Sequence, residues 1–138
     1  MGNLYIDSNI LIDFLRGRNE AEFRSGEFIR KAFEKNNLFI SALTVHITMY
    51  VIRGDEFSRE KVKNLFDLFE IVLLSGLDTK KALEIDFRDY EDVLQYLAAA
   101  KNCKVIITRD KKDFEKINKL VGKKMEILTP AEWLESGG

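Results

Sequence analysis

The chain has 138 residues, of which 46% are hydrophobic and 33% are charged, a composition that fits one globular domain and excludes disordered or low-complexity classes. Its 22 Lys and Arg residues against 23 Asp and Glu residues give a net charge of -1. That balance argues against a protein that holds duplex nucleic acid by its overall charge.

The first half of the chain predicts strands and helices in alternation. A short β-favouring run over residues 4–6 stops at Asp7 and leads directly into a helix. The later helices present apolar stripes that include Phe28, Phe33 and Phe69. The predicted strands are 4–6, 38–40 and 71–74, and the predicted helices are 10–15, 19–37, 45–52 and 58–69.

The second half continues the alternation. We expect a short helix capped by Asp78 and Thr79, a helix ended by Gly122 with Leu120 on its apolar side, and a last helix started by Pro130. The full set is a helix over 78–83, a helix over 89–102, a strand over 105–107, a helix over 110–122, a strand over 125–128 and a helix from 130.

This alternation specifies an α/β fold, a three-layer sandwich with a central, mostly parallel sheet flanked by helices. We expect one domain over residues 1–135 and a disordered tail over 136–138. The lone cysteine, Cys103, excludes an internal disulfide framework and a thiolate zinc site. No apolar run approaches the roughly 20 residues of a membrane span, and no leader precedes the first strand. We therefore expect a cytoplasmic protein with no membrane contact.

Acidic residues gather where the predicted strands end, which is the edge where open α/β sheets bind ligands. Asp7 follows the first strand, and Asp110 and Asp113 follow the strand over 105–107. An Asp at such a junction is commonly a helix cap, so capping alone accounts for Asp7 or Asp110 taken singly.

Two more acids lie one turn apart on one face of the predicted helix over 89–102. Asp89 in the first turn is explained by the helix dipole, whereas Asp92 lies deeper and beside an apolar residue. Carboxylates that converge within about 4 to 6 Å repel one another unless a cation neutralises them.

Oxygen ligands suit Mg²⁺ or Mn²⁺, and one histidine and one cysteine are too few for a typical zinc site. Carboxylates around a hard cation are suited to hydrolysing phosphodiesters. The glycine-rich loops that cradle nucleotide phosphates are absent from the sequence. The single histidine, His46, has no visible partner and suggests a structural or surface role.

Four segments in chain order resemble the PIN-domain ribonucleases, which include the VapC-type toxins of toxin-antitoxin pairs. They are LYIDSNILID at 4–13, DYEDVLQ at 89–95 with AAA at 98–100, VIITRDKKDF at 105–114 and ILTPAEWL at 127–134. The resemblance implies a PIN-like fold and metal-dependent cleavage of RNA, with Mg²⁺ or Mn²⁺ as the cofactor. It also implies a possible antitoxin partner, and we expect a homodimer.

The resemblance assigns roles to individual residues of this chain. It implies Asp7, Asp92 and Asp110 as the metal-binding catalytic acids, with Asp113 as a fourth catalytic acid. Its supporting residues are Asn9, which would orient Asp7, Thr108, which would hydrogen-bond within the acid cluster, and Asp89, a second-shell or alternate ligand.

One acid of the family pattern is missing. The family usually places a Glu three residues after the Thr of a Ser-Ala-x-Thr strand end, and Ile47 stands there in this chain. Isoleucine cannot bind a hard cation, and His46 and Thr48 point about 100° to either side of that position on a helix.

This departure leaves two hypotheses open. One is an active nuclease with a reduced acidic site, and the other is a PIN-fold module that binds RNA or a partner protein without turnover. A third hypothesis is a different fold with an Asp at a strand end, such as a phosphotransfer receiver or a dehalogenase-like phosphatase. The phosphatase would need a second Asp where Asn9 stands.

A basic run borders the predicted acidic site. Such a run is usually a solvated helix face, but beside this site it could also attract RNA phosphates, with Arg109, Lys111 and Lys112 as candidate RNA contacts. Arg16, Arg18 and Arg24 could contact RNA or an antitoxin. The basic residues of the run are Lys101, Lys104, Arg109, Lys111, Lys112, Lys116, Lys119, Lys123 and Lys124.

Overall fold

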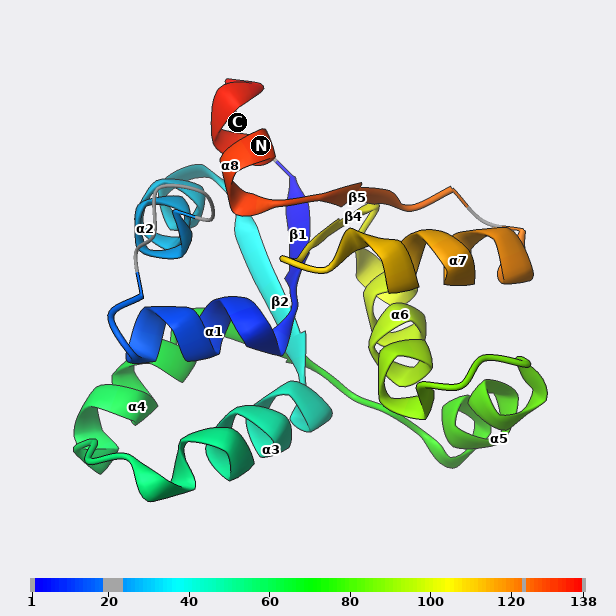
Figure 1. Ribbon diagram of the computed structural model, residues 1–138, viewed down its shortest axis with the longest axis horizontal. Coiled ribbons are helices and arrows are strands. Elements are labelled where there is room, and N and C mark those ends of the chain that lie inside the picture. Colours follow the sequence, from blue (N-terminus) through cyan, green and yellow to red (C-terminus); the bar gives the residue numbers. More distant parts are fainter. Residues whose placement is uncertain (1, 19–23, 123, 138) are drawn as a thin grey trace.

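The computed structural model describes residues 2–18, 24–122 and 124–137 (Figure 1). Within these residues five strands alternate with eight α-helices and one 3-10 turn. In chain order they are β1 Asn3–Ile6, α1 Ser8–Leu15, α2 Ser25–Lys35, β2 Asn37–Ser41, α3 Ala42–Val51, η1 Ile52–Gly54, α4 Arg59–Phe66, β3 Phe69–Val72, α5 Gly76–Glu84, α6 Tyr90–Asn102, β4 Val105–Ile107, α7 Lys111–Val121, β5 Glu126–Leu128 and α8 Pro130–Glu135.

The strands form one sheet in the order β3-β2-β1-β4-β5, and each of its four pairings is parallel. Tyr5 of the central strand β1 lies opposite Phe39 of β2 on one side and Ile106 of β4 on the other. The chain proceeds outward from β1 in both directions, so the strand order reverses at β1 and β4. The predicted sheet is confirmed, and this reversal is where such folds open a crevice at the strand carboxyl ends.

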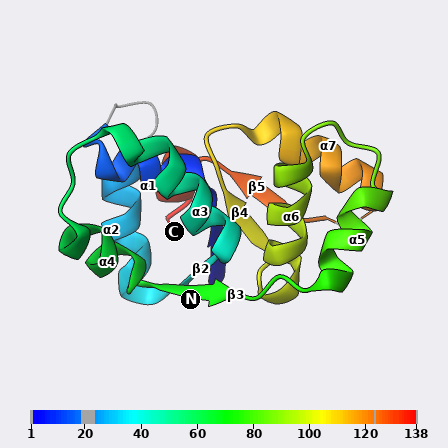
Figure 2. The ribbon, with the colours of Figure 1, turned by 90° about the horizontal axis from the view of Figure 1, so that it is seen from below.

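Helices cover both faces of the sheet, which confirms the three-layer prediction. Figure 2 shows α1 to α4 on one side of the strands and α5 to α7 on the other. In one core Phe28 of α2 packs edge-on against Trp133 of α8, with ring centroids 5.2 Å apart. In the other, Val93 and Tyr96 of α6 pack with Phe114 of α7. Burial of these apolar side chains is the main force that holds the layers together.

The predicted helix over 19–37 is shorter in the structure. Arg24 has a left-handed backbone with φ 52°, which is incompatible with a continuous helix, so α2 begins at Ser25. Residues 19–23 lie outside the described part of the chain. Phe33, which we expected on the apolar side, is 47% exposed.

The prediction for residues 58–74 is wrong in its boundaries. Helix α4 ends at Phe66, and Phe69, expected on its apolar stripe, instead begins β3. β3 lies at one edge of the sheet, and two residues of the predicted strand, Ile71 and Leu73, are exposed.

Smaller differences occur at helix ends and on outer faces. Ser75 caps α5 and shares a capping box with Asp78, whereas we expected Asp78 and Thr79 as the caps. Leu120 is exposed rather than buried. Ser136 still donates a 3.0 Å backbone hydrogen bond to Glu132, and residue 138 of the predicted tail lies outside the described residues. Among the described helices, none has the length and apolar character to cross a membrane.

Candidate active site

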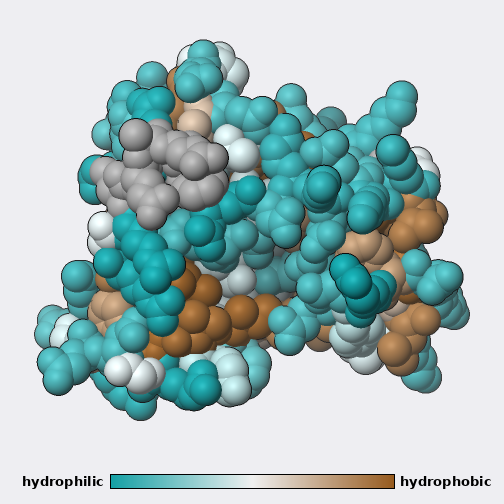
Figure 3. Space-filling view, in the orientation of Figure 1, coloured by the Kyte–Doolittle hydropathy of each residue, from teal (hydrophilic) through white to brown (hydrophobic). Residues whose placement is uncertain are grey.

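Five aspartates from four places in the chain surround the strand reversal. Elements β1, β4, α6 and α7 lie next to one another there (Figure 1). Figure 3 shows mostly hydrophilic side chains on this part of the surface, whereas hydrophobic side chains gather between α1 and α3 and over α5. The five are Asp7, Asp89, Asp92, Asp110 and Asp113.

Asp7 connects β1 to α1 and is buried. One carboxylate oxygen, Oδ1, accepts the Ser8 backbone N–H at 2.7 Å, so Asp7 does cap the helix. The other oxygen, Oδ2, accepts the Thr108 hydroxyl at 2.8 Å. Burial raises the pKa of Asp7, the hydrogen bonds oppose that rise, and the charge of Asp110 adds to it. Asp7 therefore both caps α1 and belongs to the acidic site.

Thr108 joins the two strand ends of the site. Its hydroxyl oxygen accepts the Asp110 backbone N–H at 3.0 Å and the Asn9 side-chain amide at 3.4 Å, while its hydrogen is donated to Asp7. Asn9 Oδ1 in turn accepts the Arg109 backbone N–H at 3.4 Å. Asn9 thus reaches Asp7 through Thr108 and not directly.

The tightest group of carboxylates comes from the two helices. Oxygens of Asp89, Asp92 and Asp113 all lie within 4.8 Å of one another. Asp89 caps α6 by accepting the Asp92 backbone N–H at 3.3 Å. The pKa of Asp92 is raised to about 8, first by burial and then by the nearby charges of Asp89, Asp7 and Asp113. Asp92 is therefore the residue that links the helix acids to Asp7.

This grouping differs from the ligand set that the sequence resemblance implies. Asp92 belongs to both sets, but the residues grouped with it as possible ligands are Asp89 and Asp113, which the resemblance does not count among the metal-binding acids. Asp110 is exposed and acts on Asp7 through its charge. The sequence signal for the tighter group is the one-turn spacing of Asp89 and Asp92 on one helix face.

These carboxylates fit a hard divalent cation. An octahedral Mg²⁺ with oxygen ligands at about 2.1 Å places adjacent ligands about 3.0 Å apart and opposite ligands about 4.2 Å apart. Three oxygens within 4.8 Å of one another reach those spacings after small movements of the side chains. A raised pKa on the central acid is expected when like charges converge without a cation, and an ion there would reverse that effect.

No acid stands at the end of β2. Ile47 is half-buried on α3 and offers no ligand atom, His46 is exposed, and the Thr48 hydroxyl donates to the Thr44 carbonyl at 2.7 Å. Neither neighbour of Ile47 therefore takes the place of the Glu that the family pattern has there. Among the described residues, the acids of the site come from the end of β1, from α6 and its cap, from the segment that joins β4 to α7, and from the first turn of α7.

The candidate RNA contacts occupy different environments. The Arg109 guanidinium pairs with the buried Asp13 of α1 at 3.1 Å, and Lys111 pairs with Glu132 at 3.1 Å. Lys112 is exposed. The sequence reasoning missed the role of Asp13, although its position six residues after Asp7 on an otherwise apolar helix was a signal of a buried, paired charge.

The rest of the basic run is mostly exposed. Lys101 pairs with Asp78 on α5, and Lys123 lies outside the described residues. Besides Lys101, the exposed lysines of the run are Lys104, Lys112, Lys116, Lys119 and Lys124. Among the other basic candidates, Arg16 pairs with Asp55 at 2.7 Å and Arg24 pairs with Glu27, while Arg18 is exposed.

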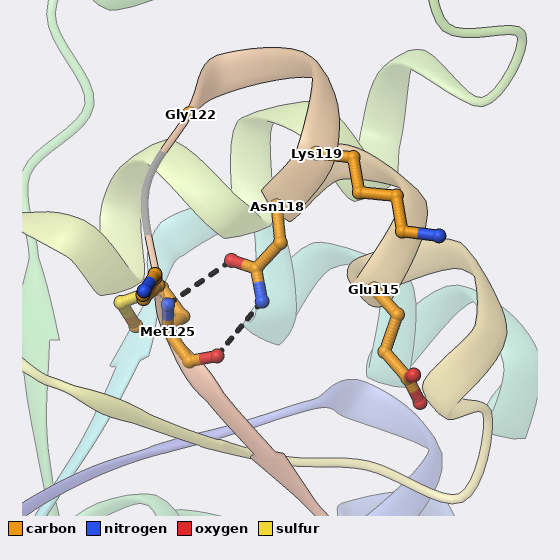
Figure 4. Close-up of a pocket in the computed structure, with 6 residues that line it drawn as sticks. Glu115, Asn118, Lys119, Gly122 and Met125 are labelled. Carbon is orange, nitrogen blue, oxygen red and sulfur yellow. Dashed lines mark hydrogen bonds between the residues drawn. The ribbon is translucent and has the colours of Figure 1, made fainter.

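A recess at the turn between α7 and β5 holds none of the acids of the site (Figure 4). In it the Asn118 side chain donates to the Met125 carbonyl at 2.8 Å and accepts the Met125 N–H at 3.1 Å. These paired bonds fasten β5 to α7. The recess is thus explained by the packing of the turn, and the acidic site remains the candidate for chemistry.

Comparison with known proteins gives consistent relatives. The family description PIN domain matches residues 3–112. Ribonuclease VapC1 from Aquifex aeolicus (strain VF5) is 27% identical over 141 residues, covering 96% of this chain and 93% of that protein.

Solved structures share the fold at lower identity. VapBC2 from Rickettsia felis, bound to a DNA fragment from its promoter, has a TM-score of 0.66 at 16% identity and covers 91% of this chain and 96% of the matched chain. VapBC-1 from nontypeable Haemophilus influenzae has a TM-score of 0.65 at 16% identity, covering 94% and 98%. A toxin-antitoxin complex from Klebsiella pneumoniae has a TM-score of 0.59 at 22% identity, covering 92% and 97%.

Proposed function

The chain belongs to the PIN domain family, and on that premise we propose that it is a metal-dependent ribonuclease that hydrolyses RNA phosphodiester bonds at the acidic site. The observation that carries the proposal is the convergence of Asp89, Asp92 and Asp113, whose carboxylate oxygens lie within 4.8 Å of one another. The relative named as a ribonuclease, VapC1 of Aquifex aeolicus, supports nuclease chemistry at the level of the family.

The ion is Mg²⁺ or Mn²⁺, because every available ligand is a carboxylate oxygen. When bound, such an ion supplies an acidified water and shields phosphate charge. Asp92 would hold it together with Asp89 and Asp113, while Asp7 and Asp110 complete the acidic site from the strand ends. Thr108 keeps the Asp7 carboxylate oriented by its 2.8 Å hydrogen bond, so that carboxylate is fixed before substrate arrives.

RNA is drawn to the site by the exposed part of the basic run, of which Lys112 lies closest in sequence to Asp110 and Asp113. Arg109 and Lys111 can add to this only by leaving their ion pairs with Asp13 and Glu132. Because the attraction comes from a few lysines, the affinity for RNA falls as salt is added.

We further propose that the protein acts in the cytoplasm as the toxin of a toxin-antitoxin pair, as a homodimer. This partner assignment is supported by the structural relatives, which are VapBC and toxin-antitoxin complexes.

A second candidate function is a PIN-fold module that binds RNA or protein without turnover. One observation favours it: Ile47 leaves the end of β2 without the acid of the family pattern. Both candidates predict binding of RNA, but only the ribonuclease predicts new RNA ends in the presence of metal.

The decisive experiment measures cleavage of single-stranded and structured RNA with Mn²⁺ or Mg²⁺. Asp92→Asn is expected to lower the rate at least about 100-fold, because it removes the shared ligand while keeping the shape of the side chain. Asp86→Asn is the matched control, since Asp86 is an exposed acid outside the cluster. Equal cleavage by Asp92→Asn and wild type would mean a contaminating nuclease, and Mn²⁺ binding without any cleavage would favour the binding module.

A further inference from the structure

A buried network of uncharged polar groups lies one layer below the acids. It joins β1, the start of α3 and α6, and each of its four side chains is at most 1% exposed. The Gln95 carbonyl oxygen Oε1 accepts the Tyr5 hydroxyl and, at 2.9 Å, the Thr44 hydroxyl. The Tyr5 oxygen also lies 3.1 Å from Ser41 Oγ and 3.1 Å from Thr44 Oγ1.

The register of the network matches that of the site. Tyr5 of β1 precedes Asp7 by two residues, and Asp7 continues the extended backbone of the strand, so both side chains face the same side of the sheet. Gln95 follows Asp92 by three residues, about one turn of α6, so both lie on the same side of that helix. The contact between Tyr5 and Gln95 is thus the next layer beneath the place where Asp7 and Asp92 approach each other.

Gln95 is an unusual choice if its role is only to fill space. Its Oε1 has two donors, but its Nε2 is buried with no hydrogen-bond partner in the described residues. A buried amide donor without a partner costs stability, and an apolar side chain of similar size would avoid that cost. The directed bonds therefore point to a role other than stability.

The hydrogen bonds of Gln95 can instead fix the orientation of α6. The apolar contacts of Val93, Ala98 and Ala99 are not directional and tolerate a small rotation or shift of the helix. The hydrogen bonds of Gln95 to residues of two other elements do not, because they weaken steeply as their geometry departs from linear. They fix α6 relative to β1 and α3.

We propose that Gln95 is a positioning residue for the metal site, which it serves by holding α6 at the rotation that sets Asp92 against Asp7. This inference rests on the proposed function, because the acids must share an ion for their spacing to matter. Tyr5 and Thr44 are the two groups through which Gln95 acts. None of the three touches the ion.

The test is a Mn²⁺ titration of the purified full-length protein, followed by calorimetry or by the paramagnetic resonance of free Mn²⁺. Gln95→Met keeps the volume and removes the hydrogen bonds, and it is expected to weaken Mn²⁺ binding by about tenfold. Tyr5→Phe is expected to have a similar effect. Because both changes break one contact, the double variant is expected to lose no more affinity than Gln95→Met alone.

A structural role would give a different pattern. Thermal unfolding without metal is expected to leave Gln95→Met at least as stable as wild type, since the unpartnered amide is gone. Tyr96→Phe is the matched control, because it also removes the hydroxyl of a buried tyrosine. Tyr96 lies on α6 and its hydroxyl bonds to Asn118 on α7, so this variant is expected to leave Mn²⁺ affinity unchanged. Lowered stability of Gln95→Met with unchanged Mn²⁺ affinity would overturn the proposal.

The two proposals fail separately. If wild type binds Mn²⁺ and loses that binding in Asp92→Asn, but Gln95→Met binds as wild type does, only the positioning role is wrong. If wild type binds no Mn²⁺, there is no ion for Gln95 to serve, and both the metal-dependent function and the positioning role are rejected.

Discussion

At the carboxyl ends of β1 and β4 the polar groups are carboxylates, whereas at the neighbouring end of β2 they are hydroxyls and one amide. In the hydroxyl region, Ser41 and Thr44 bond to each other, to Tyr5 and to Gln95. In the acidic region, burial and then the charges of Asp89, Asp7 and Asp113 raise the pKa of Asp92. The groups of the first region are joined by hydrogen bonds, whereas those of the second repel one another unless a proton or a cation neutralises them.

The difference between these regions separates positioning from ion binding. Directed hydrogen bonds between neutral groups fix α6 relative to β1 and α3, whereas adjacent carboxylates repel one another, and a bound metal ion would relieve that repulsion. Changes of charge inside these regions and at the ion pairs around them should therefore have effects that can be told apart, and the four below are ordered from the largest to the smallest.

The largest expected loss of stability comes from Arg109→Ala, because Asp13 would lose the cation that pairs with it in the interior. The Asp13 side chain is 2% exposed and that of Arg109 is 33% exposed. Breaking a fully buried pair costs about 3–5 kcal/mol, and the partial exposure of Arg109 reduces the expected cost to about 2–3 kcal/mol. Urea unfolding measures it.

The neighbouring exposed cation supplies the control for that variant. Lys112→Ala is expected to leave stability unchanged and to weaken RNA binding while lowering its salt dependence. The reverse pattern, with Arg109→Ala stable but poor in binding RNA, would return Arg109 to the role of an RNA contact.

Next in size is the effect of Ile47→Glu, which places a carboxylate on α3 next to the hydroxyl region, where the family pattern has one. If the acidic site is a four-acid site that lacks one member, the new carboxylate raises Mn²⁺ affinity by about tenfold, or about 1.4 kcal/mol. Ile47→Gln, which has the same length but no charge, is expected to bind Mn²⁺ as wild type does. An unchanged Mn²⁺ titration for Ile47→Glu would remove this interpretation of the site.

The order of the elements, the parallel sheet and the two helical layers could be predicted from the sequence, because each depends on local periodicity. The boundaries that failed depend on tertiary position: Ile71 and Leu73 are apolar, yet Ile71 lies in the edge strand β3, Leu73 follows it, and both are exposed. Nothing local in the sequence distinguishes such an edge from a buried strand.

The site was predictable to a similar degree. The strand ends located Asp7 and Asp110, and the helix spacing placed Asp89 with Asp92 on one face. That Asp113 would join Asp89 and Asp92 in one group depends on how α7 packs on α6, which no spacing in the sequence contains. The pairing of Tyr5 with Gln95 joins residues 90 positions apart and has no local signal.

Removing one acid should stabilise the metal-free protein. The pKa of Asp92 is raised from its ordinary value of 3.8 to about 8. Between pH 3.8 and pH 8 the folded protein therefore keeps a proton on Asp92 that the unfolded chain has lost. The stability of the fold is thus greatest below pH 3.8 and falls as pH rises toward 8. Asp92→Asn is expected to flatten this decline and to gain about 1–2 kcal/mol at pH 9 after allowance for solvent screening.

The measurement is urea unfolding in a chelator at pH 5, 7 and 9, with Asp86→Asn as the control. A gain that is equal at all three values would mean that the substitution acts through packing and not through charge. Added Mn²⁺ is expected to reverse the order of the two proteins, because only wild type keeps the full ligand set.

The smallest effect is expected at Asp78, an acid whose surroundings are the opposite of those of Asp92. A hydrogen bond from Lys101, together with one from the Ser75 backbone N–H, lowers the pKa of Asp78 to about 2. A lowered pKa stabilises the fold above 3.8, and that contribution disappears as pH falls toward 2. Asp78→Asn should therefore cost about 0.5–1 kcal/mol of stability at pH 7, a small value because solvent screens the pair with Lys101. Near pH 2 the substitution should cost almost nothing. The contribution of Asp78 to the free energy of unfolding thus rises with pH, whereas that of Asp92 falls. If Asp78→Asn and Asp92→Asn shifted the unfolding midpoint in the same direction at neutral and high pH, the assignment of Asp78 to pairing and of Asp92 to repulsion would be contradicted.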